Sequence, residues 1–460
     1  MIALRGNQSL RSRLERWGPT SIALFASATS FAVYFCMYAF RKPFAVATYA
    51  GYEFANTGIE LKTALVLSQL FGYVASKYIG VKFCSQLPRE RLMAAMILLI
   101  LFAECALLGF AIAPSNWKVV ALFCNGLPLG MIWGLAMRYL EGRRTTEFLV
   151  ATLSFSYIAS TGFVKDVGRC LLDGWGVDPF WMPFCVGALF LPPVLLSIWL
   201  LDAVPAPDLQ DEAERSKRTA MTGSDQWAFL AHFSFGLIVL TLAYILLTAF
   251  RDFRDNYAVE ILNEIKLAKV PGIFTKIELV IAVVVTLTLA GLSFFRRNRN
   301  ALLATFSIMT LGTLMLGAAT LLWQAGWLSG LAWMILVGLG AYLAYVPYTV
   351  LFERIFAVTR ASGSSVFAIY LIDSGGYTGS AAMQLYKDLW HAETSRLHFF
   401  VNFSLALSII GFAMLLFSGW YFICEEQRTR EAGILADVAS THSLPCAAPD
   451  AMPVGDEEIA

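Results

Sequence analysis

An arginine with two tyrosines behind it lies inside a long apolar stretch near the start of the chain. The segment Tyr34–Phe44 reads YFCMYAFRKPF and belongs to an apolar run over about residues 21–50. On a helix, the spacing of Tyr34, Tyr38 and Arg41 predicts that their side chains share one face. A charge at membrane depth is costly unless it faces a cavity or a partner. Because a guanidinium matches carboxylate and phosphate with paired hydrogen bonds, this face predicts an anion-binding site.

The same arrangement returns 210 residues later in the chain. Tyr244, Thr248 and Arg251 occupy the positions of the first tyrosine, the second tyrosine and the arginine of the first segment. A two-fold repeat with one membrane arginine in each half is typical of transporters that bind their substrate near the midplane. We therefore expect Arg41 and Arg251 to face one another across a central cavity. In the alternative interpretation, Asp255 simply neutralises Arg251 or Arg254.

Further cations inside apolar spans are candidates for the same site. Lys77 either contacts substrate or extends its amine to the membrane interface. Lys165 shares a short stretch with Asp166 and Arg169, so it either joins an internal ion pair or faces the cavity. Lys42 follows Arg41 directly and is expected to point away from its face, because successive helical residues are about 100° apart.

Acidic residues within the spans are candidates for coupling or gating. We expect Asp255, Asp373, Glu278 and Asp166 to pair with cations or to take up protons, since burial of a carboxylate favours its neutral form. Glu141 and Glu353, which match in the repeat, are expected to lock one end of the molecule through ion pairs between helices.

Composition restricts the class of protein. Hydrophobic residues make up 58% of the 460 residues and charged residues 15%, whereas a soluble domain carries about 25% charged residues. The eight cysteines and four histidines show no metal-ligand spacing, and no nucleophile stands with a base. We therefore expect no cofactor, no metal, no enzymatic activity and no nucleic-acid partner. The expected partners are the lipid bilayer and a small-molecule anion, and we expect a monomer.

Apolar runs long enough to cross about 30 Å of hydrocarbon recur along the chain. They predict an all-α membrane protein with twelve spans, near residues 21–50, 61–83, 92–113, 118–139, 146–171, 179–202, 227–257, 271–294, 300–322, 327–352, 362–386 and 398–423.

Loop charge predicts how these spans are oriented. Most loop lysines and arginines fall on the side of the N-terminus, and the other side carries only Lys62, Lys118, Lys266, Lys269, Lys387 and Arg396. The positive-inside rule therefore predicts that both termini lie in the cytoplasm. We expect the protein in a bacterial inner membrane.

A polar interruption divides the chain into two six-helix halves. We expect an N-terminal half at 1–202, a cytoplasmic linker at 203–226, a C-terminal half at 227–424 and a disordered cytoplasmic tail at 425–460.

These features together resemble the major facilitator superfamily, and some motifs resemble its organophosphate:phosphate antiporter branch. The branch has a tyrosine followed by Arg-Lys-x-Phe in its first helix, which is similar to Tyr38, Arg41, Lys42 and Phe44 here. The matches elsewhere are Ser76–Gly80, Trp181–Pro183, Asp202 with Pro205, and Arg251 with Asp255. MYAFRKPF also resembles a group of uncharacterised bacterial membrane proteins. Unlike the branch, the fifth span has no histidine.

The resemblance implies two pseudo-symmetric halves and an alternating-access transporter. We predict a carrier of a small anionic metabolite, phosphorylated ones included, that binds it through Arg41, Arg251, Tyr38, Tyr34, Lys77 and Lys165. A proton-coupled symporter of another small solute, or a transporter-like membrane sensor, remains as an alternative.

Overall fold

The computed structural model describes residues 9–55, 57–140, 146–206, 231–292, 294–295, 297–359 and 365–442. Within these ranges the chain is helical apart from short connections and one isolated bridge between Glu53 and Glu60. Glu141 and most of the expected linker lie outside the described residues. The expectation that Glu141 and Glu353 each form ion pairs between helices at the inward side therefore stays a prediction.

Twelve long helical segments follow the twelve predicted spans. The N-terminal half contains α2 (Pro19–Met37), α3 (Leu61–Gln86), α4 (Arg89–Ile112), α5 (Ser115–Leu140), α6 (Thr146–Arg169) and α7 (Met182–Asp202). The C-terminal half contains α10 (Ser234–Asn256), α12 (Ile273–Leu292), α13 (Asn298–Gln324), α14 (Gly330–Tyr345) with α15 (Tyr348–Thr359), α16 (Ser365–Trp390) and α17 (Arg396–His442).

Nine segments within the described residues are long and apolar enough to cross a membrane. The other three are α3, α6 and α16, with 26, 24 and 26 residues. At a rise of 1.5 Å per residue, each is at least about 36 Å long and spans the hydrocarbon. These three helices carry charges because they pack against the opposite half rather than only against lipid. The prediction of an all-α membrane protein with twelve spans is confirmed.

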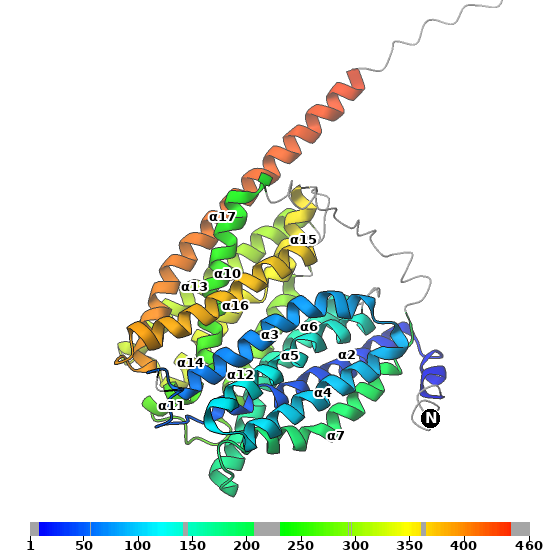
Figure 1. The fold of residues 1–460 in the computed structure, drawn as a ribbon. Coiled ribbons are helices and arrows are strands. Elements are labelled where there is room, and N and C mark those ends of the chain that lie inside the picture. The colour runs from blue at the N-terminus through cyan, green and yellow to red at the C-terminus, as the bar shows by residue number, and fades with distance from the viewer. Residues whose placement is uncertain are drawn as a thin grey trace, which may run out of the picture.

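Two helix pairs join the halves. Helix α3 packs on α16, and α6 packs on α12. In Figure 1, helices α2–α7, coloured from blue through cyan to green, form one group, and α3 lies beside the gold helix α16 of the other. Polar side chains on these pairs are therefore placed where the two halves meet.

The first span is not one helix to residue 50, and that prediction is wrong. Helix α2 ends at Met37, and two short turns follow at Tyr38–Phe40 (η1) and Pro43–Val46 (η2). Pro43 has no N–H to donate and its ring clashes with the carbonyl four residues back, so the helix cannot continue through it. Arg41 and Lys42 therefore lie in a break between helical segments.

The last helix is longer than predicted. Helix α17 continues to His442, although a disordered tail was expected after residue 424. The extension begins EEQRTREAGILA, which is rich in good helix formers. Figure 1 shows it projecting away from the bundle in orange and red.

Candidate functional site

Two buried amides hold the broken segment that carries Arg41. Gln69 Nε2 on α3 donates to the Arg41 carbonyl at 3.0 Å, and Asn125 Nδ2 on α5 donates to the Phe40 carbonyl at 3.1 Å. Gln69 also donates to Asn125 Oδ1 at 2.8 Å. These bonds satisfy carbonyls that the helix break leaves free. Neither amide was predicted from the sequence, although a polar amide inside an apolar span is a visible signal.

A close helix contact brings those amides together. A Cβ on Gly126 would lie 2.2 Å from the Gln69 carbonyl oxygen, so only glycine lets α5 approach α3 this closely. The position of Arg41 is thus set by α3 and α5 rather than by its own helix.

The Arg41 guanidinium is stacked on aromatic rings. Its Cζ lies 4.0 Å from the centre of the Tyr73 ring and 5.8 Å from that of Tyr38. The ring centres of Tyr34 and Tyr38 are 5.6 Å apart, and Tyr34 also contacts Trp133. Among the described residues, no carboxylate forms an ion pair with Arg41. The half-buried guanidinium therefore keeps hydrogen-bonding capacity for an anion.

Arg251 on α10 has a related setting in the other half. Its Cζ lies 4.1 Å from the centre of the Tyr345 ring. Its Nη2 and Nε lie 2.8 and 3.1 Å from Asp252 Oδ1. The predicted neutralisation of Arg251 by Asp255 is wrong, because the adjacent Asp252 fills that role.

Two tyrosines lie close to both arginines. Tyr38 and Tyr377 each lie within electrostatic range of both Arg41 and Arg251. The ring centres of Tyr73 on α3 and Tyr377 on α16 are 5.4 Å apart, so this contact joins the two helices. The two guanidiniums therefore border one aromatic region at the junction of the halves.

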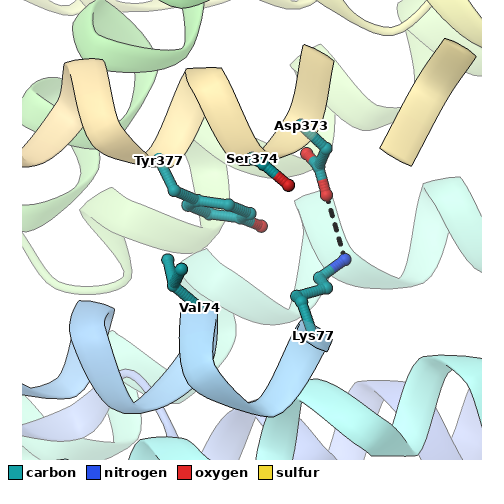
Figure 2. Close-up of a pocket in the computed structure, with 5 residues that line it drawn as sticks. All are labelled: Val74, Lys77, Asp373, Ser374 and Tyr377. Atoms are coloured by element: carbon teal, nitrogen blue, oxygen red, sulfur yellow. Dashed lines mark hydrogen bonds and ion pairs between the residues drawn. The ribbon is translucent and has the colours of Figure 1, made fainter. Parts of the chain in front are cut away.

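Lys77 and Asp373 form an ion pair across this junction. Lys77 Nζ on α3 lies 3.0 Å from Asp373 Oδ2 on α16, and the side chains are 20% and 13% exposed. Figure 2 shows the pair beside Val74, Ser374 and Tyr377. These five residues line a cavity of about 10 Å³. That volume has room for about one water molecule. Lys77, predicted to bind substrate, is thus engaged by an acid in this structure.

Asp255 is held between two lysines of the opposite half. It forms ion pairs with Lys42 and Lys165, and its backbone carbonyl accepts a further bond from Lys165 at 2.5 Å. Lys42 was expected to point away from the site. Because the helix is broken, it turns towards α10 and also approaches Asn256 Oδ1 at 3.4 Å.

The expected ion pair within α6 is wrong. Asp166 accepts from the backbone N–H of Thr275 at 2.6 Å and from its hydroxyl at 2.5 Å, so it caps the first turn of α12. Arg169 pairs with Asp173 at 2.7 Å. Asp166 thus fastens α6 to α12, which leaves a gating role as a prediction.

Glu278 pairs within its own half. Its Oε1 lies 2.8 Å from Arg254 Nη1, and both side chains are buried. Arg254 also contacts the Met334 carbonyl at 3.3 Å. The predicted neutralisation of Arg254 by Asp255 is therefore wrong as well.

One end of the molecule is closed by further polar contacts between the halves. Lys62 at the start of α3 lies 2.5 Å from Glu260 on α11 (Ala258–Glu264). The hydroxyls of Thr63 and Tyr257 lie 2.7 Å apart. Arg396 at the start of α17 lies 2.9 Å from Glu60. All three contacts lie at helix ends on the side opposite the linker.

A cavity of about 550 Å³ lies outside this closed end, with Glu53, Glu60, Glu260, Glu264 and Arg396 among its lining residues. Burial raises the pKa of the phenol of Tyr49, which also lines it, so this group stays neutral.

Comparison with solved structures identifies the fold. A D-xylose–proton symporter matches with a TM-score of 0.58 and 17% identity, over 88% of this chain and 98% of that one. A peptide transporter matches with a TM-score of 0.58 and 14% identity, over 90% and 98%. The human organic anion transporter MFSD10 matches with a TM-score of 0.53 and 14% identity, over 87% and 100%. These similarities establish the major facilitator fold.

Sequence comparison assigns the chain to a family. No curated protein sequence matches it significantly. The model described as "Family of unknown function (DUF5690)" matches residues 43–425, which include most of the chain. The protein therefore belongs to the DUF5690 family and has the major facilitator fold.

Proposed function

We propose that this protein is an alternating-access secondary transporter for a small anionic metabolite, a class that includes phosphorylated metabolites. The observation that carries the proposal is the pair Arg41 and Arg251, one from each half, which share Tyr38 and Tyr377 as electrostatic neighbours. An anion between them would contact both halves at once, which is the arrangement that alternating access requires.

The state of the two guanidiniums favours an anion over a neutral solute. Each has one face on a tyrosine ring, at 4.0 Å for Arg41 and 4.1 Å for Arg251. The edge donors of Arg41 therefore stay available, whereas Asp252 takes up two of the donors of Arg251. Arg41 has no acidic partner among the described residues. Its charge at membrane depth is costly without a counter-ion, and a bound anion would supply one.

The contacts between the halves fit a carrier closed on one side. For the pairs in which both partners are described, they run from Lys62–Glu260 inwards to Asp255 and then to Lys77–Asp373. With both termini in the cytoplasm, as loop charge predicts, the closed end would face the periplasm of a bacterial inner membrane. Transport would then require these ion pairs to open while contacts form at the linker side.

A thermal-shift screen of the purified protein tests the proposal. The ligands are inorganic phosphate, organophosphates and carboxylates, with neutral sugars and amines for contrast. A ligand at one hundred times its dissociation constant should add about 2.7 kcal/mol of stability. We expect one anionic class to stabilise the protein, and Arg41→Ala and Arg251→Ala to abolish the effect.

Arg299→Ala is the matched control, because Arg299 is 43% exposed and pairs with Glu426 on α17, outside this region. It should respond to ligand as the wild type does. Stabilisation by cations or neutral solutes alone, or unchanged responses in both site variants, would contradict the proposal.

A further inference from the structure

A chain of contacts connects the two arginines through the ion pair between the halves. On the α3 side, Tyr73 stacks on Arg41, and its ring centre lies 5.5 Å from Lys77 Nζ. On the other side, the Tyr244 hydroxyl lies 2.9 Å from Asp373 Oδ1 and 2.9 Å from the Tyr345 hydroxyl. Tyr345 in turn stacks on Arg251.

The tyrosine hydroxyls in this series of contacts can reverse their hydrogen bonds when Asp373 takes up a proton. Tyr244 has a single hydroxyl hydrogen, so when it donates to Asp373 it accepts from Tyr345. A proton on the carboxyl of Asp373 would let Asp373 donate to Tyr244 instead, and the bond between the tyrosines would reverse. The protonation state of Asp373 is therefore coupled through Tyr244 to the hydroxyl of Tyr345, and Arg251 stacks on the ring of Tyr345.

The groups that face Asp373 come from four helices. Lys77 and Tyr73 face it from α3, Tyr244 from α10 and Tyr345 from α14. Tyr377 is its neighbour on α16. Within the described residues, Lys77 is the one cation that forms an ion pair with it. If Lys77 leaves, a largely buried carboxylate keeps only hydroxyl partners, and burial then favours its neutral form.

We propose that Asp373 takes up a proton when an anion binds between the arginines, and that Lys77 changes its partner from Asp373 to the anion. This deepens the proposed function and rests on it. When an anion binds between the arginines, Lys77 moves from Asp373 to the anion. Asp373 then takes up one proton from solvent on a carboxylate oxygen. A monoanion and a proton enter together, so the net charge of the buried site does not change.

The other buried acids fit this role less well. Asp255 is paired with two lysines, so the departure of one still leaves the other. Glu278 is held by Arg254 inside one half. Asp373 also joins the two halves, but Lys77 alone among the described residues forms an ion pair with it, and it borders the small cavity in Figure 2, which has room for about one water molecule.

A carbodiimide experiment tests the exchange without a ligand. Dicyclohexylcarbodiimide reacts with protonated carboxyls, and mass spectrometry locates the adduct. We expect Lys77→Met to raise labelling of Asp373 at pH 7 several-fold over wild type. The exposed Lys276 supplies the control, and Lys276→Met should leave labelling low. Lys77→Arg keeps a cation and should also stay low. Equal labelling in Lys77→Met and wild type would overturn the proposal.

A second measurement tests the link to the anion. Labelling of wild-type Asp373 is compared at fixed pH with and without inorganic phosphate, and with the best anion of the thermal screen. An increase that Arg41→Ala abolishes supports the linkage. If an anion stabilises the protein but leaves labelling unchanged, the linkage is wrong and the anion carrier stands. If no anion stabilises the protein, the proposed function fails, and the result with Lys77→Met alone decides whether Lys77 controls the proton on Asp373.

Discussion

The carbonyl oxygen of Arg41 accepts a 3.0 Å hydrogen bond from Gln69 Nε2 on the neighbouring helix α3. This bond and the one from Asn125 to Phe40 take the place of helical bonds that Pro43 prevents. Arg41, to which we assign anion binding in the proposed function, is thus positioned by a network of amides, and we expect the proposed site to be sensitive to residues that touch no substrate.

Asn125→Leu should damage both stability and anion binding. The change leaves the carbonyls of Phe40 and Ala103, which Asn125 now satisfies at 3.1 Å each, without a donor. An unsatisfied buried polar group costs about 1–3 kcal/mol. We expect a lower melting temperature and a weaker thermal shift with anions. Asn402→Leu is the control on the exposed face of α17, and a melting temperature for Asn125→Leu equal to that of the control would contradict this role.

Asp255→Asn should be more damaging than Lys42→Met. The first change leaves two lysines facing a neutral amide, whereas the second leaves the pair of Asp255 with Lys165 in place. Breaking a buried pair by removing one partner typically costs about 3–5 kcal/mol. Thermal unfolding of both variants in the same detergent shows which of them loses more stability.

The same variants give a functional check. Loss of Asp255 should also open the closed end, so a cysteine introduced at Tyr52 should react faster with an impermeant maleimide in Asp255→Asn than in wild type. A smaller loss of stability in Asp255→Asn than in Lys42→Met, or unchanged labelling, would show that this cluster does not hold the halves together.

Glu104→Met should stabilise the protein. Both carboxylate oxygens of Glu104 on α4 are buried, and neither has a hydrogen-bond partner among the described residues. The side chain fills the space beside Gly187 on α7, where a Cβ would lie 2.0 Å from Glu104 Oε2. An apolar side chain of similar volume removes the desolvation penalty of about 1–3 kcal/mol without leaving a cavity. A rise in melting temperature is expected for this variant and none for the exposed Glu90→Met; a fall for Glu104→Met would indicate a partner in the working protein.

The number of helices and the two arginines were predictable because both depend on local pattern. Apolar runs of about 20 residues identify membrane helices with little ambiguity, and the repeat placed Arg41 and Arg251 at matching positions. The charge partners were not predictable in the same way. Helical spacing suggested that Asp255, four residues after Arg251, would face it. In the structure, lysines from two other helices hold Asp255, and Asp252 turns to Arg251 instead.

The direction of Lys42 was missed for a related reason. A continuous helix would have turned it away from the face of Arg41. Pro43 stood in the sequence as a signal that the helix ends, and its effect was to direct Lys42 towards Asp255. Pairing between distant charges depends on how the two halves dock, and a single sequence carries no local signal for that.

In contrast to the variants described above, Asp252→Asn should strengthen anion binding. Asp252 occupies the edge of the Arg251 guanidinium, with Nη2 and Nε both directed at its Oδ1. Removing that negative charge frees donors for the ligand and removes repulsion of it. A gain of roughly 1.4 kcal/mol would correspond to about tenfold tighter binding. Arg251→Lys should act in the opposite direction, because lysine loses both the planar fork and the stacking on Tyr345 at 4.1 Å. Titration calorimetry with the anion found by thermal shift measures both variants, and weaker binding by Asp252→Asn would mean that this acid holds Arg251 in its binding geometry rather than competing with the anion.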